Sequence, residues 1–230
     1  MTFPDGSGPS SWFAVLALAP CVNTTLNSIT FSSTILDVES LPTVINMKIP
    51  NTVISMIPTP TGGPADGFGS DQINNNFTTL EVAEDNPIYD SRDNCNAVIE
   101  TATNTLVMSS QNTFIPNSVI SLASCSFWDC DIETLTIPNN VTSVADYVFA
   151  NSNLKSVVWD VITHADFNYY VDPTCALFPS SLEEIEFGPN VEVIPGNLCR
   201  GTSIKEVYIP STVNSVGKNA FSPLWNGSLS

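Results

Sequence analysis

Histidine is the side chain most often used in general acid–base catalysis, and it is scarce in this chain. His164 is its single histidine, and it lies in the irregular segment 161–166. A hydrolase would need a nucleophile, a base and a pocket around such a residue, and the sequence shows no such constellation. We therefore predict that His164 is a loop histidine with local hydrogen bonds and that the chain has no catalytic residues.

Carboxylate and amide oxygens gather in one turn, where they could bind calcium. The four side chains are those of Asp90, Asp93, Asn94 and Asn96. Their order does not match the D-x-[DN]-x-[DN]-G loop of calcium sites, so hydrogen-bonded turns are the favoured interpretation. Elsewhere, Glu183 and Glu184 resemble a glycosidase pair, but neighbours in a strand point to opposite faces. We predict no metal site and no cofactor.

The six cysteines are scattered along the chain. They lie at Cys21, Cys95, Cys125, Cys130, Cys175 and Cys199. This spacing fits neither a zinc module nor a small disulfide scaffold, and 230 residues are enough to build a core without covalent links. We expect buried free thiols.

The composition excludes two classes of partner. Six Lys and Arg residues stand against 23 Asp and Glu, which gives a net charge of −17. Such a chain is repelled by nucleic acid and by anionic lipid. The apolar run at residues 12–19 is too short to span a bilayer, and no basic residue precedes it as in a signal peptide. We therefore expect no nucleic-acid binding, no membrane insertion, and protein partners.

A repeat supplies the elements that would position any site. The pattern apolar-x-x-apolar-x-apolar occurs at residues 132–137, 154–159, 182–187 and 204–209, and each copy predicts a short strand with one buried face. A fixed tail follows: Pro138, Val141, Val144 and Phe149 recur with the same offsets as Pro210, Val213, Val216 and Phe221, and as Pro116, Val119, Leu122 and Phe127. One strand and one tail therefore form one repeating unit.

The period is 22 residues. The expected strands end near Phe31, Ile49, Val82, Ile115, Ile137, Trp159, Phe187 and Ile209, at intervals of 18, 33, 33, 22, 22, 28 and 22. When the repeat is extended backwards from the strand that ends at Phe31, residues 10–21 fall in the tail half of a repeat, and Cys21 takes the position that Phe149 has in its own repeat. Such a period predicts coils whose strands stack in parallel on one wall, with the tails forming the opposite wall.

The tail Ile-Pro-x-x-Val-x-x-Val-x-x-x-x-Phe, followed by a Leu-x-x-Val-x-Ile strand, resembles the BspA-like leucine-rich repeats of bacterial and protist surface proteins. The stretch 86–106 is similar to an insertion common in such proteins of gut Bacteroidales. The resemblance covers roughly residues 10–222 and is specific in the second half. It implies a surface-exposed recognition scaffold and does not fix a ligand.

Each of the two 33-residue intervals exceeds the 22-residue period by 11 residues, and each holds an insertion. Residues 58–72 are rich in Gly and Pro, which predicts a surface loop, and residues 90–108 predict a hairpin added to the wall of the coil. The tail at 222–230 contains no obvious amphipathic helix to cover the last coil, so we expect possible end-to-end or larger assembly there.

Side chains between the buried strand positions should line up on an exposed face. One expected row contains Glu184 and Glu206, and the other contains Phe114, Val158, Glu186 and Tyr208. Apolar or aromatic residues stand in this row where the core does not demand them. The alternatives are a solvated sheet face that tolerates strand-forming residues and an exposed ladder that recognises a protein.

These observations predict one leucine-rich repeat solenoid over residues 1–230, of the right-handed β/α superhelix type, mostly β with short 3-10 or helical turns. We expect a non-enzymatic protein-binding or adhesion module of a cell-surface or secreted protein. The alternative is a structural or receptor-recognition component of a virus particle, such as a phage of gut bacteria. The binding residues that we expect are Phe114, Val158, Glu184, Glu186, Glu206 and Tyr208.

Overall fold

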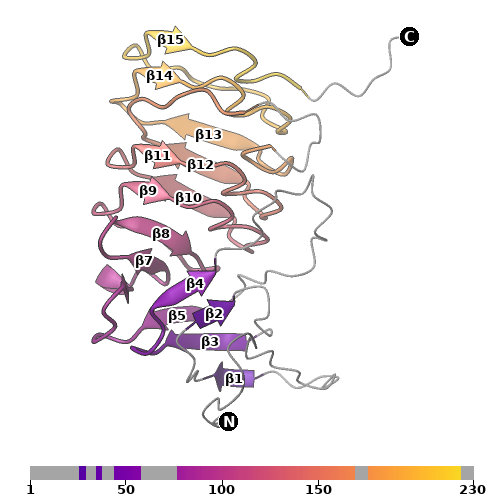
Figure 1. Ribbon diagram of the computed structural model, residues 1–230. Coiled ribbons are helices and arrows are strands. Elements are labelled where there is room, and N and C mark those ends of the chain that lie inside the picture. Colours follow the sequence, from indigo (N-terminus) through magenta and orange to yellow (C-terminus); the bar gives the residue numbers. More distant parts are fainter. Residues whose placement is uncertain (1–25, 30–34, 38–43, 58–76, 169–175, 224–230) are drawn as a thin grey trace.

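The computed structural model describes residues 26–29, 35–37, 44–57, 77–168 and 176–223. In these residues the protein is mostly β, and its one helical element is the 3-10 turn η3 (Arg92–Asn94). Successive turns of the chain lie one above another from the N-terminal to the C-terminal end (Figure 1). The helical part of the expected β/α repeat is therefore missing from the described residues, because the tails turn through tight bends instead.

Parallel strands form the first wall of the stack. One sheet has the order β1-β3-β5, made of β1 (Leu26–Ile29), β3 (Val44–Ile49) and β5 (Thr79–Val82). A second has the order β10-β12-β13, made of β10 (Thr134–Ile137), β12 (Ser156–Trp159) and β13 (Glu184–Phe187). Strands β3, β5, β10, β12 and β13 end at the residues that the repeat predicts. In the second sheet Leu135 pairs with Val157, and Val157 pairs with Ile185, so residues in the same position of consecutive repeats form one buried column.

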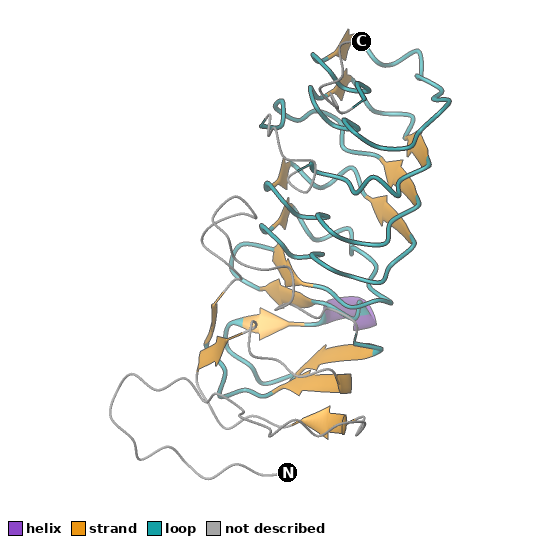
Figure 2. Ribbon diagram, turned by 90° about the vertical axis from the view of Figure 1, so that its right-hand side faces the viewer, coloured by secondary structure: helices purple, strands orange, loops and turns teal. Residues whose placement is uncertain are grey.

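The tails form a second, narrower set of strands on the opposite side of the stack (Figure 2). Its two-residue strands are β9 (Ser121–Leu122), β11 (Ser143–Val144), β14 (Val193–Ile194) and β15 (Ser215–Val216). β9 pairs with β11, and β14 pairs with β15, all in parallel. Nearer the N-terminus, β2 (Ile35–Asp37) pairs in parallel with β4 (Ser55–Ile57). The Pro residues that precede these tails end the first ladder because proline donates no N–H.

The insertion at 90–108 forms a hairpin in this second wall. Its strands β7 (Val98–Glu100) and β8 (Thr105–Met108) are antiparallel; β6 (Tyr89–Asp90) pairs with β7, and β8 pairs in parallel with β9. The sheet order is therefore β11-β9-β8-β7-β6. The inserted strands thus continue the ladder of the tails.

The core contains two main clusters that meet at the hairpin. The larger runs from Cys95 to Ala220 and contains Ile99 and Leu106, whereas the smaller contains Val98 and Met108 together with residues of β3 and β5. Aromatic rings stack from coil to coil in the larger cluster: the centroids of Phe127 and Phe149 are 5.3 Å apart, and those of Phe149 and Phe178 are 5.1 Å apart. The hairpin therefore contributes buried side chains to both clusters.

Two expected strands are absent. Residues 111–115 form no strand because their backbone bonds go elsewhere: Gln111 N–H donates to Phe77 O at 3.2 Å and Phe114 N–H donates to Cys95 O at 3.3 Å. Residues 203–209 form none either, although Ser203 N–H still donates to Leu182 O at 2.9 Å. This outermost segment has a described neighbour on one side alone, which leaves Ile209 42% exposed.

Several expectations lie outside the described residues. They concern the half-repeat at 10–21, the strand end at Phe31, the loop at 58–72, Cys21, Cys175 and the end of the tail at 224–230. Within the described residues, no helix is long and apolar enough to cross a membrane.

Candidate binding surface on the parallel strands

The first wall presents every second side chain to solvent. β10 and β13 both alternate exposed and buried residues, because successive side chains of a strand point to opposite faces. The pairing of β10, β12 and β13 aligns two rows across the strands: Thr134, Ser156 and Glu184 in one, Thr136, Val158 and Glu186 in the other. We call this exposed side of residues 112–208 the strand face.

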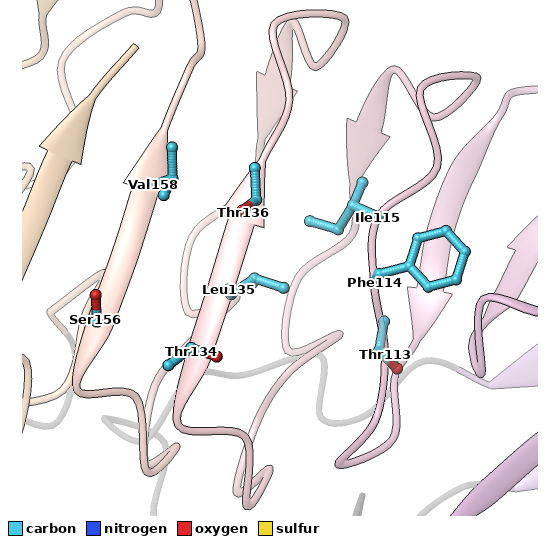
Figure 3. Close-up of a pocket in the computed structure, with 8 residues that line it drawn as sticks. All are labelled: Thr113, Phe114, Ile115, Thr134, Leu135, Thr136, Ser156 and Val158. Carbon is cyan, nitrogen blue, oxygen red and sulfur yellow. The ribbon is translucent and has the colours of Figure 1, made fainter.

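A hollow of about 380 Å³ lies in the strand face between residues 113–115 and strands β10 and β12. Figure 3 shows Ile115 and Leu135 extending towards each other, whereas the Phe114 ring turns away from β10. Both Ile115 and Leu135 are buried, so the floor of the hollow is apolar. Its rim carries hydroxyl-bearing side chains and one wholly apolar side chain, that of Val158; the hydroxyl-bearing residues are Thr113, Thr134, Thr136 and Ser156.

The hollow exists because the first ladder is interrupted there. β10 pairs with β12 and is the edge strand of its sheet, while residues 111–115 are bonded back towards Phe77 and Cys95. Thr113 Oγ1 strengthens that attachment by donating to Asn96 O at 2.6 Å. The inserted hairpin therefore draws this segment away from the parallel sheet and opens a depression on its surface.

The C-terminal part of the strand face is acidic. Glu184, Glu186 and Glu206 are all exposed, and Ser156 Oγ donates to Glu184 Oε2 at 3.2 Å. The three salt bridges among the described residues lie elsewhere, at Lys48–Glu81, Arg92–Asp90 and Lys155–Glu133. Tyr208 is 81% exposed in the same region. A cationic partner would therefore meet several carboxylates beside an accessible aromatic ring.

Of the six predicted binding residues, Val158, Glu184 and Glu186 lie in these paired rows, with Val158 half-buried. Phe114, Glu206 and Tyr208 lie outside the paired strands and are exposed, Phe114 at 47%. The hollow itself was not predicted, and neither were its floor residues Ile115 and Leu135. An 11-residue insertion just before Ile115 was the available signal, since an insertion in one coil disturbs pairing with the next.

The residues considered for chemistry have structural roles. His164 lies in a loop, as predicted, and its Nδ1 lies 2.7 Å from the neighbouring Ala165 O. Its other contacts are not local: Nε2 accepts the N–H of Val144, 20 residues away, at 3.1 Å, and the ring stacks on Phe167. Asp90, a considered calcium ligand, is held by the Arg92 guanidinium at 2.6 and 2.8 Å. In the described part of the chain, no group of three or more His, Cys, Asp or Glu is placed to hold a metal ion.

The cysteines in the described residues are buried. Cys95 and Cys199 are free thiols, as expected, and Cys125 and Cys130 are also enclosed. Burial raises the pKa of the Cys95 and Cys130 thiols to about 11, and it raises that of Cys199 further. Raised pKa values keep these thiols protonated and poorly nucleophilic at neutral pH.

Comparison with known protein families is decisive for the repeat. A family model described as a BspA type leucine-rich repeat region matches residues 104–225 in six copies, which is more than half of the chain. The chain belongs to the BspA-type leucine-rich repeat family. The BspA-type match begins inside the inserted hairpin and covers the coils that carry the hollow and the acidic strands. No curated protein sequence matches the chain.

Three solved structures are similar to this BspA-type chain. A leucine-rich repeat protein from Eubacterium ventriosum has 12% identity and a TM-score of 0.44, and the alignment covers 86% of this chain and 64% of that one. The pneumococcal vaccine antigen PcpA has 14% identity and a TM-score of 0.42, with 81% and 55% covered. A leucine-rich cell surface protein from Faecalibacterium prausnitzii has 16% identity and a TM-score of 0.40, with 82% and 42% covered. The chain thus spans less than two thirds of each. The family match gives no support to the alternative expectation of a virus-particle component.

Proposed function

We propose that this chain is a non-enzymatic protein-binding or adhesion module of a cell-surface or secreted protein, and that the strand face is its binding surface. The observation that carries the proposal is the strand face itself: an apolar hollow and an unneutralised acidic region share one side of the molecule. Membership of the BspA-type family supports a surface role. The proposal includes a single right-handed solenoid domain over residues 1–230.

The distance between the hollow and the acidic region limits the kind of partner that could contact both. Parallel strands lie about 4.8 Å apart, so the hollow beside β10 and the carboxylates of β13 are separated by about 10 Å across the sheet. An extended peptide advances about 3.3 Å per residue. An extended partner that crosses the strands would therefore place an apolar side chain in the hollow and a Lys or Arg two or four residues away, beside Glu184 and Glu186, because side chains at these spacings face the same side.

The test compares two double variants with the same change in charge. Glu184→Gln with Glu186→Gln alters the strand face, whereas Glu84→Gln with Glu192→Gln removes two exposed carboxylates elsewhere. Binding to a panel of extracellular matrix proteins and to cultured epithelial cells is measured by surface plasmon resonance and flow cytometry, at low and moderate salt. We expect the strand-face variant to lose at least about tenfold in affinity at low salt and the control to bind as wild type does.

A second variant tests the hollow. Thr136→Arg projects a long charged side chain from the exposed row beside it and should abolish binding without unfolding the protein, because Thr136 is exposed. Equal binding by wild type, Thr136→Arg and the strand-face double variant would show that this surface is not the site.

A further inference from the structure

The two walls of the stack differ between two neighbouring coils, residues 111–127 and residues 133–149. Their second wall is continuous, because β9 and β11 pair in parallel and Phe127 N–H donates to Val148 O at 2.9 Å. In the first wall no backbone hydrogen bond joins residues 111–115 to β10, although the structure describes both segments. The two coils are therefore joined on one side and apart on the other, and the hollow lies on the open side (Figure 3).

The open side leaves one edge of β10 without backbone partners. On its other edge, Ser156 is the partner of Thr134, and its N–H donates to Glu133 O at 3.1 Å. Successive peptide groups of a strand point to alternate sides, so those of Glu133 and Leu135 face β12, whereas those of Thr134 and Thr136 face the hollow. No described residue forms a backbone hydrogen bond with Thr134 or Thr136 on this side. Such a row of N–H and C=O groups is a template for another strand.

A further parallel strand would satisfy these groups with a single residue. In the pattern set by Ser156, the residue opposite Leu135 would donate its N–H to Thr134 O and accept the N–H of Thr136. Its side chain would point inward, onto the apolar floor that Ile115 and Leu135 form, and its two neighbours would point to solvent. An antiparallel strand would instead turn the N–H and C=O of the inward residue away from β10.

The size and the charge of the protein limit the occupant. The hollow of about 380 Å³ is at the lower end of the range for ligand pockets, which suits a segment of a few residues. A second copy of the chain carries the same charge of −17 and is repelled, whereas a segment with basic side chains is attracted.

We propose that the hollow binds a short extended segment of a partner protein as an added parallel strand, which continues the sheet β10-β12-β13. The segment has one inward apolar residue between outward polar or basic residues. This mode of binding rests on the proposed function, because it takes the strand face as the binding surface. Beyond the hollow, the partner chain crosses β12 to reach Glu184 and Glu186.

The test uses the full chain and three peptides in NMR titrations at low salt. The probe is acetyl-Thr-Lys-Val-Lys-Thr-amide, and two derivatives carry a backbone N-methyl group, one on Val and one on the Lys that follows it. We expect the probe to bind with a Kd near or below about 1 mM and to shift the Thr136 amide signal. Methylation of Val removes the donor to Thr134 O and should weaken binding at least about tenfold, whereas methylation of Lys should weaken it less than about threefold.

A pair of proline variants provides the control on the protein. Thr136→Pro removes the N–H that faces the hollow, and an edge strand accepts proline where no ladder bond is lost. It should weaken binding of the probe at least about tenfold, whereas Ser211→Pro, in an exposed turn of the last coil, should change the Kd by less than about twofold. If Thr136→Pro fails to fold, the two methylated peptides decide the question on the wild-type protein.

Four results overturn strand addition. They are no binding of the probe at 20 mM (about the limit of such titrations), equal binding of the probe and its Val-methylated form, a stronger effect of methylation at Lys than at Val, and a dimer of the chain that disappears in Thr136→Pro. The proposed function is tested separately. It stands if Glu184→Gln with Glu186→Gln weakens binding to partner proteins, whatever the peptides do.

Discussion

At single positions, burial follows the slot that a residue occupies in its coil. Ile137, Trp159 and Phe187 end consecutive strands and are at most 5% exposed, whereas Ile209 in the same slot is 42% exposed. The difference arises because each coil covers the one before it. Outside the strands, a side chain can also take the place of a backbone group. At position 164 an imidazole nitrogen, in place of a backbone carbonyl, accepts the N–H of Val144.

Val157 tests the buried column. It is 1% exposed and pairs with Leu135 on one side and Ile185 on the other. Val157→Asp should lower the free energy of unfolding by at least about 3 kcal/mol, since an unpaired carboxylate would be buried among aliphatic groups. Urea titration followed by circular dichroism gives the value. Thr136→Asp on the exposed row is the control and should change the stability by less than about 0.5 kcal/mol; Ser156 is unsuitable because its hydroxyl bonds Glu184.

The buried thiols predict how stability depends on pH. Burial raises the pKa of Cys95 and Cys130 from an ordinary value of 9.0 to about 11 in the folded protein. The unfolded chain therefore loses these protons first, so the stability is full below pH 9 and falls between pH 9 and 11 by up to about 2 kcal/mol per thiol. Thermal midpoints measured across this range should fall less steeply in a Cys95→Ala, Cys130→Ala double variant. Parallel curves for the two proteins would show that other groups cause the loss.

At the scale of elements, the inserted hairpin has the largest effect on the structure. It extends the wall of the tails through β8 and β9, separates the two core clusters, and holds residues 111–115 away from β10. Arg92 fastens it at one end, with Nε and Nη2 bound to Asp90 and Nη1 bound to Asn104 Oδ1 at 2.7 Å. One element thus produces both the continuity of the second wall and the hollow in the first.

Arg92 should control the local stability of this hairpin. Arg92→Ala removes the bonds to Asp90 and Asn104, and we expect a loss of about 1–2 kcal/mol of local stability. Hydrogen exchange measured by mass spectrometry should become faster in residues 98–108 and remain unchanged in β12 and β13. Lys155→Ala is the matched control, because its salt bridge with Glu133 is exposed and contributes little. Equal effects of the two variants on residues 98–108 would contradict this role.

Sequence periodicity predicts the regular elements and fails where coils are interrupted. The strands that end at Ile137, Trp159 and Phe187 follow from spacing, because identical slots must stack. Residues 111–115 form no strand because their backbone N–H groups bond Phe77 O and Cys95 O, and the spacing of the repeat does not predict these bonds. The exposed rows were predictable by alternation alone, but the hollow joins residues from different coils, and its geometry depends on the insertion at 90–108.

At the scale of the whole molecule, each coil contacts its immediate neighbours, and the parallel sheets and the aromatic stack both continue by pairing adjacent coils. Stability in such a stack is approximately a sum over coils and their interfaces. A net charge of −17 opposes self-association of the molecule, although Ile209 and Val216 of the last coil are exposed. We therefore expect the fold to tolerate a change in the number of coils but not a shift in the register with which the coils stack.

Removal of one complete coil tests this distinction. Deleting residues 132–153 joins Asp131 to Leu154, and Leu154 then takes the slot of Ile132, exactly one 22-residue period away. Strand and tail slots stay in register, so we expect cooperative thermal unfolding at a midpoint lowered by about 5–15 °C, because a coil and one interface are lost. Deleting residues 132–142 removes half a period and places tail residues opposite strand residues, which should abolish the cooperative transition. If both deletions unfold alike, the coils are not independent units, and the second wall must be specified by contacts beyond adjacent coils.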